Sequence, residues 1–285
     1  MIAIDMHVHV PRNPNFPDVE VEQSLKNYFK PTDVPKDADD MAAKYKVWDM
    51  LAVIFSVDTQ TATGDVPDGN EYVANIVKKY PEQFIGFATV DPWKNGEAIV
   101  ELERAITSLG LKGLKLHPIQ QGFYPNDERF YPLYEKCSSL AIPILFHSGF
   151  ASAGVGTPGG LGLKLKYGAP IPGIDDVAAD FPDLTIIMAH PSWPWIEEQI
   201  AVTLHKANVY IDLSGWSPKY IPETLIHETN TRLSNKVLFG SDYPYLTPER
   251  WLREFDELHI KPEVKRKVLL DNARKVLGLG EFDKK

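Results

Sequence analysis

The chain begins with MIAIDMHVHV, residues 1–10, in which apolar and polar side chains alternate. An alternation with a period of two is typical of a β-strand with one polar face. The pattern predicts that Asp5, His7 and His9 share one face, with both imidazoles near the carboxyl end of the strand. Two imidazoles two residues apart on a strand can bind one metal ion from the same side. The first ten residues therefore predict a strand that delivers metal ligands.

The rest of the chain repeats a unit of one short apolar segment and one segment with helical spacing. Continuous Val, Ile and Leu runs alternating with helices indicate a parallel sheet that is buried on both faces. Eight such units in about 250 residues predict an α/β fold, a (β/α)8 TIM barrel, as a single domain over residues 1–285. A doubly wound open sheet is the alternative, but the first strand–helix turn lacks the glycine-rich dinucleotide fingerprint. The predicted strands are 1–10, 49–58, 84–90, 111–117, 142–147, 184–190, 208–213 and 236–242.

Two long segments between these elements are predicted to be irregular. Residues 11–35 are rich in proline and follow the first strand, where a loop could cover its metal-binding end. Residues 148–170 are rich in glycine, which favours a mobile lid loop. Both segments are expected on the side of the barrel that carries the chemistry.

Composition limits the function classes. A formal net charge of −9 argues against binding to the phosphates of nucleic acids. The single cysteine, Cys137, excludes an intrachain disulfide and fits a reducing, cytoplasmic location. The sequence shows neither a basic leader followed by an apolar run nor an apolar run of 18 residues, so we expect no secretory signal and no membrane partner.

Polar residues close several predicted strands at the end where barrel enzymes place their chemistry. Histidine, lysine and aspartate are unfavourable in apolar strands unless they have partners. Their coincidence at matching strand ends predicts a metal site at one mouth of the barrel. The residues concerned are His7, His9, Lys115, His117, His147, His190 and Asp242.

Five motifs stand at these strand ends: DMHVH (5–9), GLKLHP (113–118), FHSG (146–149), AHPSWPW (189–195) and LFGSDYP (238–244). They resemble the motifs of the amidohydrolase superfamily, and in particular of its amidohydrolase-related branch. That branch includes aminocarboxymuconate semialdehyde decarboxylase, resorcylate-type decarboxylases and hydrolases of aromatic degradation. A narrower similarity, in LKYGAP and DLSGW, is to hydrolases of 4-hydroxyphenyl-β-ketoacyl-CoA.

The resemblance implies one divalent ion, usually Zn²⁺ with Mn²⁺ or another ion as the alternative, held by His7, His9, His147 and Asp242. Such an ion lowers the pKa of a bound water from about 15.7 toward 7. Asp242 would also accept the proton of that water, and His190 would act as acid, base or electrophile.

Lys115 leaves the number of metal ions open. In binuclear members of the superfamily a carbamylated lysine at this strand bridges two ions, whereas the decarboxylase-like branch binds one. We favour one ion. Lys115 and His117 share a face of their strand and would then bind a substrate anion, although an ion pair of Lys115 with a neighbouring carboxylate is equally open.

Other residues are predicted around this centre. Asp5 is placed one layer deeper than the two histidines, where it would orient a ligand or a lysine by a hydrogen bond. Aromatic residues follow the last three strands, and aromatic side chains so placed would line a pocket for a flat or apolar substrate. They are Trp193, Trp195, Trp216, Tyr243 and Tyr245.

The leading functional hypothesis is a metal-dependent hydrolase that acts on a carbonyl-adjacent C–C, ester or amide bond of an aromatic-degradation type substrate. The alternative is a metal-dependent nonoxidative decarboxylase of an aromatic or dienoic acid. Either enzyme would take a small-molecule acid or thioester. A barrel that binds metal without catalysing a reaction is a third interpretation. Similar proteins are often dimers, which makes a homodimer the candidate assembly.

Overall fold

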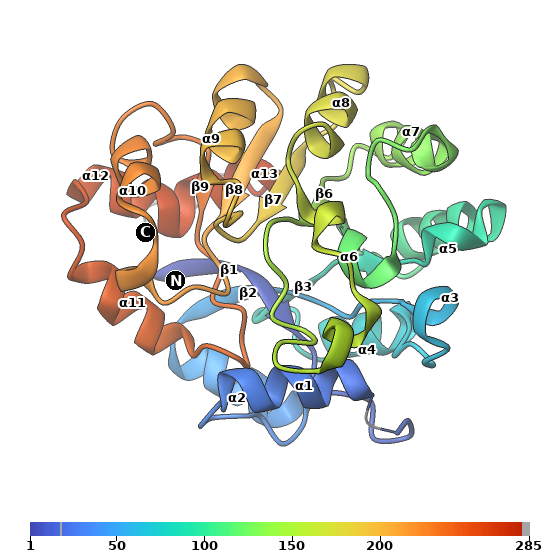
Figure 1. The fold of residues 1–285 in the computed structure, drawn as a ribbon. Coiled ribbons are helices and arrows are strands. Elements are labelled where there is room, and N and C mark those ends of the chain that lie inside the picture. Colours follow the sequence, from blue (N-terminus) through green and yellow to red (C-terminus); the bar gives the residue numbers. More distant parts are fainter. Residues whose placement is uncertain (18, 281–285) are drawn as a thin grey trace.

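The computed structural model describes residues 1–17 and 19–280. In this part of the chain, short strands lie at the centre and helices surround them (Figure 1). The strands are β1 (Ala3–His9), β2 (Met50–Phe55), β3 (Phe84–Gly86), β4 (Ala88–Thr89), β5 (Leu114–Leu116), β6 (Ile144–His147), β7 (Ile186–Ala189), β8 (Val209–Asp212) and β9 (Val237–Leu238).

The helices follow the strands in the order expected for repeated β–α units. They are α1 (Glu20–Phe29), α2 (Ala38–Val47), α3 (Gln60–Thr63), α4 (Asn70–Lys79), α5 (Gly96–Thr107), α6 (Pro118–Gln121), α7 (Tyr131–Ser139), α8 (Gly173–Asp180), α9 (Ile196–His205), α10 (Glu223–Thr229), α11 (Pro248–Asp256), α12 (Pro262–Arg266) and α13 (Asn272–Val276). None of the helices in the described residues is both long enough and apolar enough to cross a lipid bilayer.

The strands are all parallel and form two runs, β1-β2-β3 and β4-β5-β6-β7-β8-β9. Backbone hydrogen bonds join the two runs on both sides. Phe87 lies between β3 and β4, its N–H donates to the carbonyl of Ile54 at 2.9 Å, and the N–H of Ala88 donates to Gly113 at 2.7 Å. On the opposite side, the N–H of Met6 donates to the carbonyl of Phe239 at 2.9 Å. The (β/α)8 barrel predicted from the sequence is confirmed, and the predicted strand 84–90 is interrupted at Phe87.

Strand residues alternate between two apolar clusters, one inside the barrel and one between the barrel and the helices. In β2, Leu51, Val53 and Phe55 belong to the inner cluster, whereas the residues between them pack against the helices. In β5 the two leucines face the helices, which leaves Lys115 on the inner side. Inner positions near the carboxyl ends of the strands therefore point into the mouth of the barrel.

β1 contains an irregularity that corrects one prediction. The register of β1 against β2 shifts between Asp5 and Val8, as happens at a β-bulge, where one extra residue turns the following side chains to the other face. Asp5 consequently faces the helices, where it accepts a hydrogen bond from the Tyr45 hydroxyl of α2 at 2.9 Å. The prediction that Asp5 shares a face with His7 and His9 is wrong, because strict alternation does not hold across the bulge.

The two segments predicted to be irregular meet each other. Residues 11–35 contain α1, which the proline-rich composition did not predict. In the glycine-rich segment 148–170, the N–H of Gly154 donates to the hydroxyl of Ser24 in α1 at 2.8 Å. α1 and residues 151–153 also line the same cavity. Mobility of this loop stays a prediction.

Candidate active site

A cavity of about 400 Å³ opens at the carboxyl ends of the strands. Its walls include all seven polar strand-end residues that the sequence indicated, namely His7, His9, Lys115, His117, His147, His190 and Asp242. Aromatic side chains form much of the remaining wall: Tyr28, Phe29, Phe150, Trp216, Tyr220 and Tyr245. The cavity therefore combines nitrogen and oxygen donors at its base with flat apolar walls.

Three predicted metal ligands come together around one carboxylate oxygen. Nε2 of His9 lies 3.1 Å from Oδ1 of Asp242, and Nε2 of His7 lies 3.4 Å from the same atom. The donor atoms of the three residues all lie within 4.8 Å of one another. Two neutral imidazoles and a carboxylate are a donor set that suits Zn²⁺ and neighbouring divalent ions.

The protonation of these ligands follows from their burial and their neighbours. Burial raises the pKa of Asp242, but the hydrogen bond to His9 and the nearby imidazoles outweigh it and hold that pKa below its ordinary value. Burial lowers the pKa of His7 well below 6.5, and the ammonium group of Lys115 lowers it further. The carboxylate is therefore ionised and the imidazole is neutral, which are the forms that bind a cation.

The fourth predicted ligand, His147, lies on the same cavity but outside this close group. Its ring stacks on His117 with centroids 3.8 Å apart, and its centroid lies 4.8 Å from that of His190. Nε2 of His147 is buried and has no hydrogen-bond partner in the described part of the chain. Leaving a buried polar atom unpaired costs about 1–3 kcal/mol, so this nitrogen is placed to take a partner that the protein itself does not supply.

Lys115 is fully buried beside these ligands. Its Nζ lies 3.4 Å from Nε2 of His7 and 5.0 Å from the centroid of the Phe55 ring. Burial lowers the pKa of Lys115 to about 8, against the opposing charges of Asp212 and Asp242. No carboxylate oxygen of the described residues lies within ion-pair distance of Nζ, so the ion pair considered from the sequence is absent there.

His190 stands between the two groups of imidazoles, with its ring centroid 4.7 Å from that of His7. Its Nδ1 lies 3.0 Å from the carbonyl oxygen and 2.9 Å from the hydroxyl of Ser214. Gly215 makes room for this ring, because a Cβ at Gly215 would lie 2.7 Å from Nδ1 of His190. His190 and Asp242 have φ angles of 71° and 69°, a left-handed conformation that is uncommon for these residues and is concentrated at functional sites.

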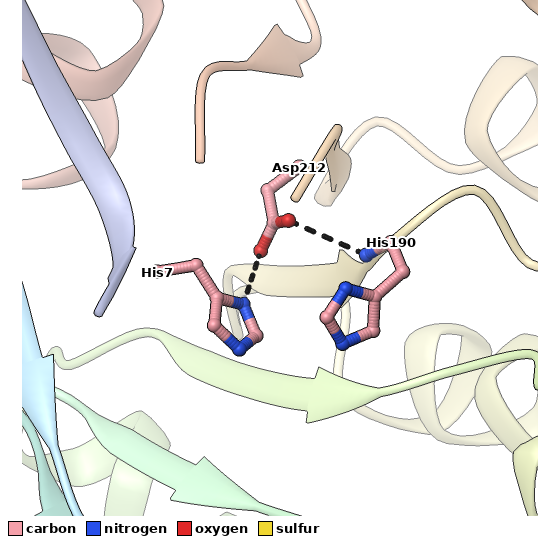
Figure 2. A group of neighbouring side chains, drawn as sticks. All are labelled: His7, His190 and Asp212. Carbon is pink, nitrogen blue, oxygen red and sulfur yellow. Dashed lines mark hydrogen bonds and ion pairs between the residues drawn. The ribbon is translucent and has the colours of Figure 1, made fainter. Parts of the chain in front are cut away.

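One residue of the site was missed by the sequence analysis. Asp212, the last residue of β8, is fully buried and lies between His7 and His190 (Figure 2). Its Oδ2 lies 3.0 Å from Nδ1 of His7, and its Oδ1 accepts a hydrogen bond from the backbone N–H of His190 at 3.3 Å. A carboxylate that ends an otherwise apolar strand, NVYID, was the signal that could have found it.

Asp5 has a different role from the predicted one. Its carboxylate accepts hydrogen bonds from the backbone N–H of Ser241 at 2.8 Å and from the Ser241 hydroxyl at 2.5 Å. It also accepts a longer bond, 3.3 Å, from the backbone N–H of His7. Burial raises the pKa of Asp5 to about 7, and these hydrogen bonds oppose the rise. Asp5 therefore fixes the backbone beside His7 and Asp242, and none of its hydrogen bonds reaches a histidine ring or a lysine.

Three of the five aromatic residues predicted to line the pocket, Trp193, Trp195 and Tyr243, do not line it. Tyr243 is fully buried on the outer side of the strands, where its ring contacts Tyr45 and Trp48. Trp193 is 49% exposed and packs on Phe150 outside the cavity wall. Trp216 and Tyr245 line the cavity as predicted.

Comparison with known proteins establishes the family. A family model described as amidohydrolase matches residues 4–279. This chain belongs to the amidohydrolase family, which confirms the resemblance seen in its sequence motifs.

Three individual proteins are similar to this chain. The chain is 25% identical over 240 residues to 2-amino-3-carboxymuconate-6-semialdehyde decarboxylase of Dictyostelium discoideum, a match that covers 74% of this chain and 65% of that protein, just under two thirds of its length. The uncharacterised TIM-barrel protein Bb4693 of Bordetella bronchiseptica has a TM-score of 0.81 and 26% identity, with 97% and 98% of the two chains covered. A dihydroxybenzoic acid decarboxylase of Polaromonas sp. JS666, solved with manganese and 2-nitroresorcinol, has a TM-score of 0.66 and 18% identity, with 99% and 98% covered, and it shares the fold.

Proposed function

We propose that this protein is a divalent-metal-dependent decarboxylase of a small aromatic or dienoic acid. The observation that carries the proposal is a buried ammonium group, Lys115, at the base of an aromatic-walled cavity beside the cluster of His7, His9 and Asp242. A cation at that place suits the carboxylate of a flat acid. The similarity to the Dictyostelium decarboxylase over three quarters of the chain supports the same reaction class.

The donor set fits a resident metal ion. We propose that the ion is held by His7, His9, His147 and Asp242. The donor atoms of His7, His9 and Asp242 converge, and His147 offers a buried Nε2 without a partner among the described residues. When bound, a divalent ion at this place polarises substrate oxygens and makes a water molecule more acidic. Zn²⁺ is the leading candidate and Mn²⁺ the alternative.

The other side chains would perform the remaining steps. Lys115 would bind the carboxylate that is lost, and Trp216 would pack against the plane of the substrate. His190 would take up a proton from water at Nε2 and donate it to the carbon that bears the carboxylate. The C–C bond to the carboxylate breaks, CO₂ leaves, and the electron pair left on that carbon forms the new C–H bond with this proton.

Hydrolysis, the leading hypothesis from the sequence, is the second candidate, and one observation favours it. The carbonyl of Ser214 can only accept a hydrogen bond, so Nδ1 of His190 carries the hydrogen and Nε2 is a proton acceptor. An acceptor at this place suits the removal of a proton from a water molecule that attacks a lactone or a β-keto ester.

A substrate panel separates the two reactions. The purified protein would be loaded with Zn²⁺ or Mn²⁺ and incubated in D₂O with dihydroxybenzoates, dienoic acids, lactones and β-keto esters. We expect release of CO₂ and incorporation of one deuterium at the carbon that lost the carboxylate. In His190→Asn we expect neither CO₂ release nor deuterium incorporation. Hydrolysis products without CO₂ would replace the proposal by the second candidate.

Metal content tests the centre separately from the reaction. One equivalent of metal per chain, removed by a chelator together with the activity, is expected. Two equivalents would favour the carbamylated form of Lys115, and full activity of metal-free protein would overturn the metal-dependent reaction.

A further inference from the structure

The carboxylate of Asp212 binds the two functional histidines through separate oxygens. Oδ2 lies 3.0 Å from Nδ1 of His7, which belongs to the close group of metal donors. Oδ1 accepts hydrogen bonds from the backbone N–H groups of Ser214 at 2.9 Å and His190 at 3.3 Å (Figure 2). The Ser214 hydroxyl donates to Oδ1 as well, over a short distance. One buried side chain thus connects β1, β7 and β8 beneath the cavity.

These contacts determine which ring nitrogen carries the hydrogen. A carboxylate is an acceptor, so the bond to Oδ2 requires a hydrogen on Nδ1 of His7 and leaves a lone pair on its Nε2. The Ser214 hydroxyl donates its hydrogen to Asp212, so it can only accept a hydrogen bond from His190. The Ser214 carbonyl also accepts from the same nitrogen, Nδ1 of His190. His190 therefore also carries its hydrogen on Nδ1, and its Nε2 is free.

The same group of residues could be considered a second metal site, because donor atoms of His7, His190 and Asp212 lie within 4.8 Å of one another. The hydrogen bonds argue against it. Both oxygens of Asp212 already accept bonds, and Nδ1 of His7 needs its hydrogen for one of them. Nε2 of His7 instead lies near Oδ1 of Asp242, 3.4 Å away.

We propose that Asp212 is a positioning residue that fixes the tautomer of His7, so that Nε2 of His7 keeps its lone pair, whereas the Ser214 carbonyl fixes the tautomer of His190. This lone pair, which lies 3.4 Å from Nζ of Lys115, is the one that would bind the metal. The inference rests on the proposed metal centre and is independent of which reaction the enzyme catalyses.

Asp212→Asn is the decisive variant, because it keeps the shape and replaces one oxygen by an amino group. The amide oxygen can still accept from Ser214 and the His190 backbone, which places the amino group against Nδ1 of His7. An amino group can only donate, so His7 must move its hydrogen to Nε2 and lose the lone pair directed at the metal. We expect metal affinity to fall by about 10- to 100-fold, while His190 keeps its hydrogen on Nδ1.

Two matched variants complete the design. Ser214→Ala removes the hydroxyl link to His190 and leaves the bond between Asp212 and His7, so metal affinity should stay within about twofold of the parent protein. Asp91→Asn changes another buried carboxylate that accepts from backbone N–H groups, those of Thr61 and Trp93, away from the cavity. It controls for the general cost of losing a buried charge.

The measurements are the dissociation constant for Zn²⁺ or Mn²⁺, by competition with a chelator, and the ring tautomers, by long-range ¹H–¹⁵N NMR on the metal-free protein. Parent protein with the His7 hydrogen on Nε2 would overturn the proposal even if Asp212→Asn failed to fold. So would Asp212→Asn with unchanged affinity. Parent protein that binds neither metal would instead refute the proposed metal centre, while the tautomers would still test the role of Asp212.

Discussion

The two sides of the cavity base differ in how completely their polar atoms are bonded. On the side of β1, β8 and the segment after β9, here called the tied side, His7 bonds to Asp212 and His9 bonds to Asp242. On the side of β5 and β6, the open side, His147 stacks on His117 and its Nε2 has no partner among the described residues. The tied side is held by the protein alone, whereas the open side is completed by whatever enters the cavity.

The difference indicates that the tied side fixes the geometry of the site and the open side binds the ligand. Hydrogen bonds that exist without any ligand fix the geometry of the tied side in advance, which lowers the cost of organising a site during binding. Unpaired groups on the open side gain most when a ligand arrives, because their desolvation is already complete.

The largest effect is expected from His7→Ala compared with His147→Ala. Removing His7 leaves Oδ2 of Asp212 buried without its partner, which should lower the free energy of unfolding by about 3–5 kcal/mol. Removing His147 takes away a nitrogen that had no partner, so the free energy of unfolding should fall only by the cost of the lost packing, about 2 kcal/mol. Urea unfolding in the presence of a chelator would measure the free energy of unfolding of both variants. Equal losses of stability would contradict the difference between the tied side and the open side.

Lys115→Met tests the open side by removing a buried charge and keeping the length of the side chain. We expect the metal-free protein to unfold at the same or a higher urea concentration, because an ammonium group without a carboxylate partner is costly to bury. The KM for an acid substrate should rise at least about tenfold, which corresponds to about 1.4 kcal/mol of lost binding. Lys112→Met, an exposed lysine three residues earlier, is the control and should change neither value. A large loss of stability in Lys115→Met alone would place Lys115 on the tied side.

The sequence predicted the donors of both sides and failed to predict how they are connected. The histidines and Asp242 can be recognised in the sequence, because polar residues are rare at the ends of apolar strands. The barrel then brings these strand ends together. Asp212 has the same signature, since it ends an otherwise apolar strand, and was overlooked. Its connection to His7, 205 residues away in the chain, is visible only as a hydrogen bond in the structure.

The errors have equally specific causes. Asp5 was assigned to the wrong face because a bulge in β1 breaks the alternation. Tyr243 follows the end of the last predicted strand, where alternation no longer tells which way a side chain points. Trp193 could not be placed, because loops carry no period. The helix α1 was overlooked among the prolines, although Val21, Leu25, Tyr28 and Phe29 have helical spacing.

Gly215→Ala should produce an intermediate effect on the tied side. A Cβ there would lie 2.7 Å from Nδ1 of His190 and 3.1 Å from Oδ2 of Asp242, and the φ angle of +71° adds backbone strain. Gly156 has a similar φ of +76° with nothing within 4 Å of an added Cβ. Gly156→Ala therefore reports the strain alone, about 1–2 kcal/mol. Gly215→Ala should cost more stability than this, because the clash adds to the strain, and should also lower kcat by about tenfold or more, as the ring of His190 is displaced. Equal kcat in the two variants would show that His190 does not need its present position.

The smallest effects are expected at the rim, where two tryptophans that look alike in sequence occupy different environments. Trp216 lines the cavity and packs against the core, so Trp216→Ala should raise KM about five- to tenfold for a flat substrate and leave metal content unchanged. Trp193 is 49% exposed and outside the cavity wall, so Trp193→Ala should change KM and kcat by less than twofold. Steady-state kinetics of both variants on the same substrate would compare them directly. A larger effect at Trp193 than at Trp216 would mean that the glycine-rich segment, through Phe150, brings Trp193 over the substrate once it is bound, and the open side would then extend beyond the cavity described here.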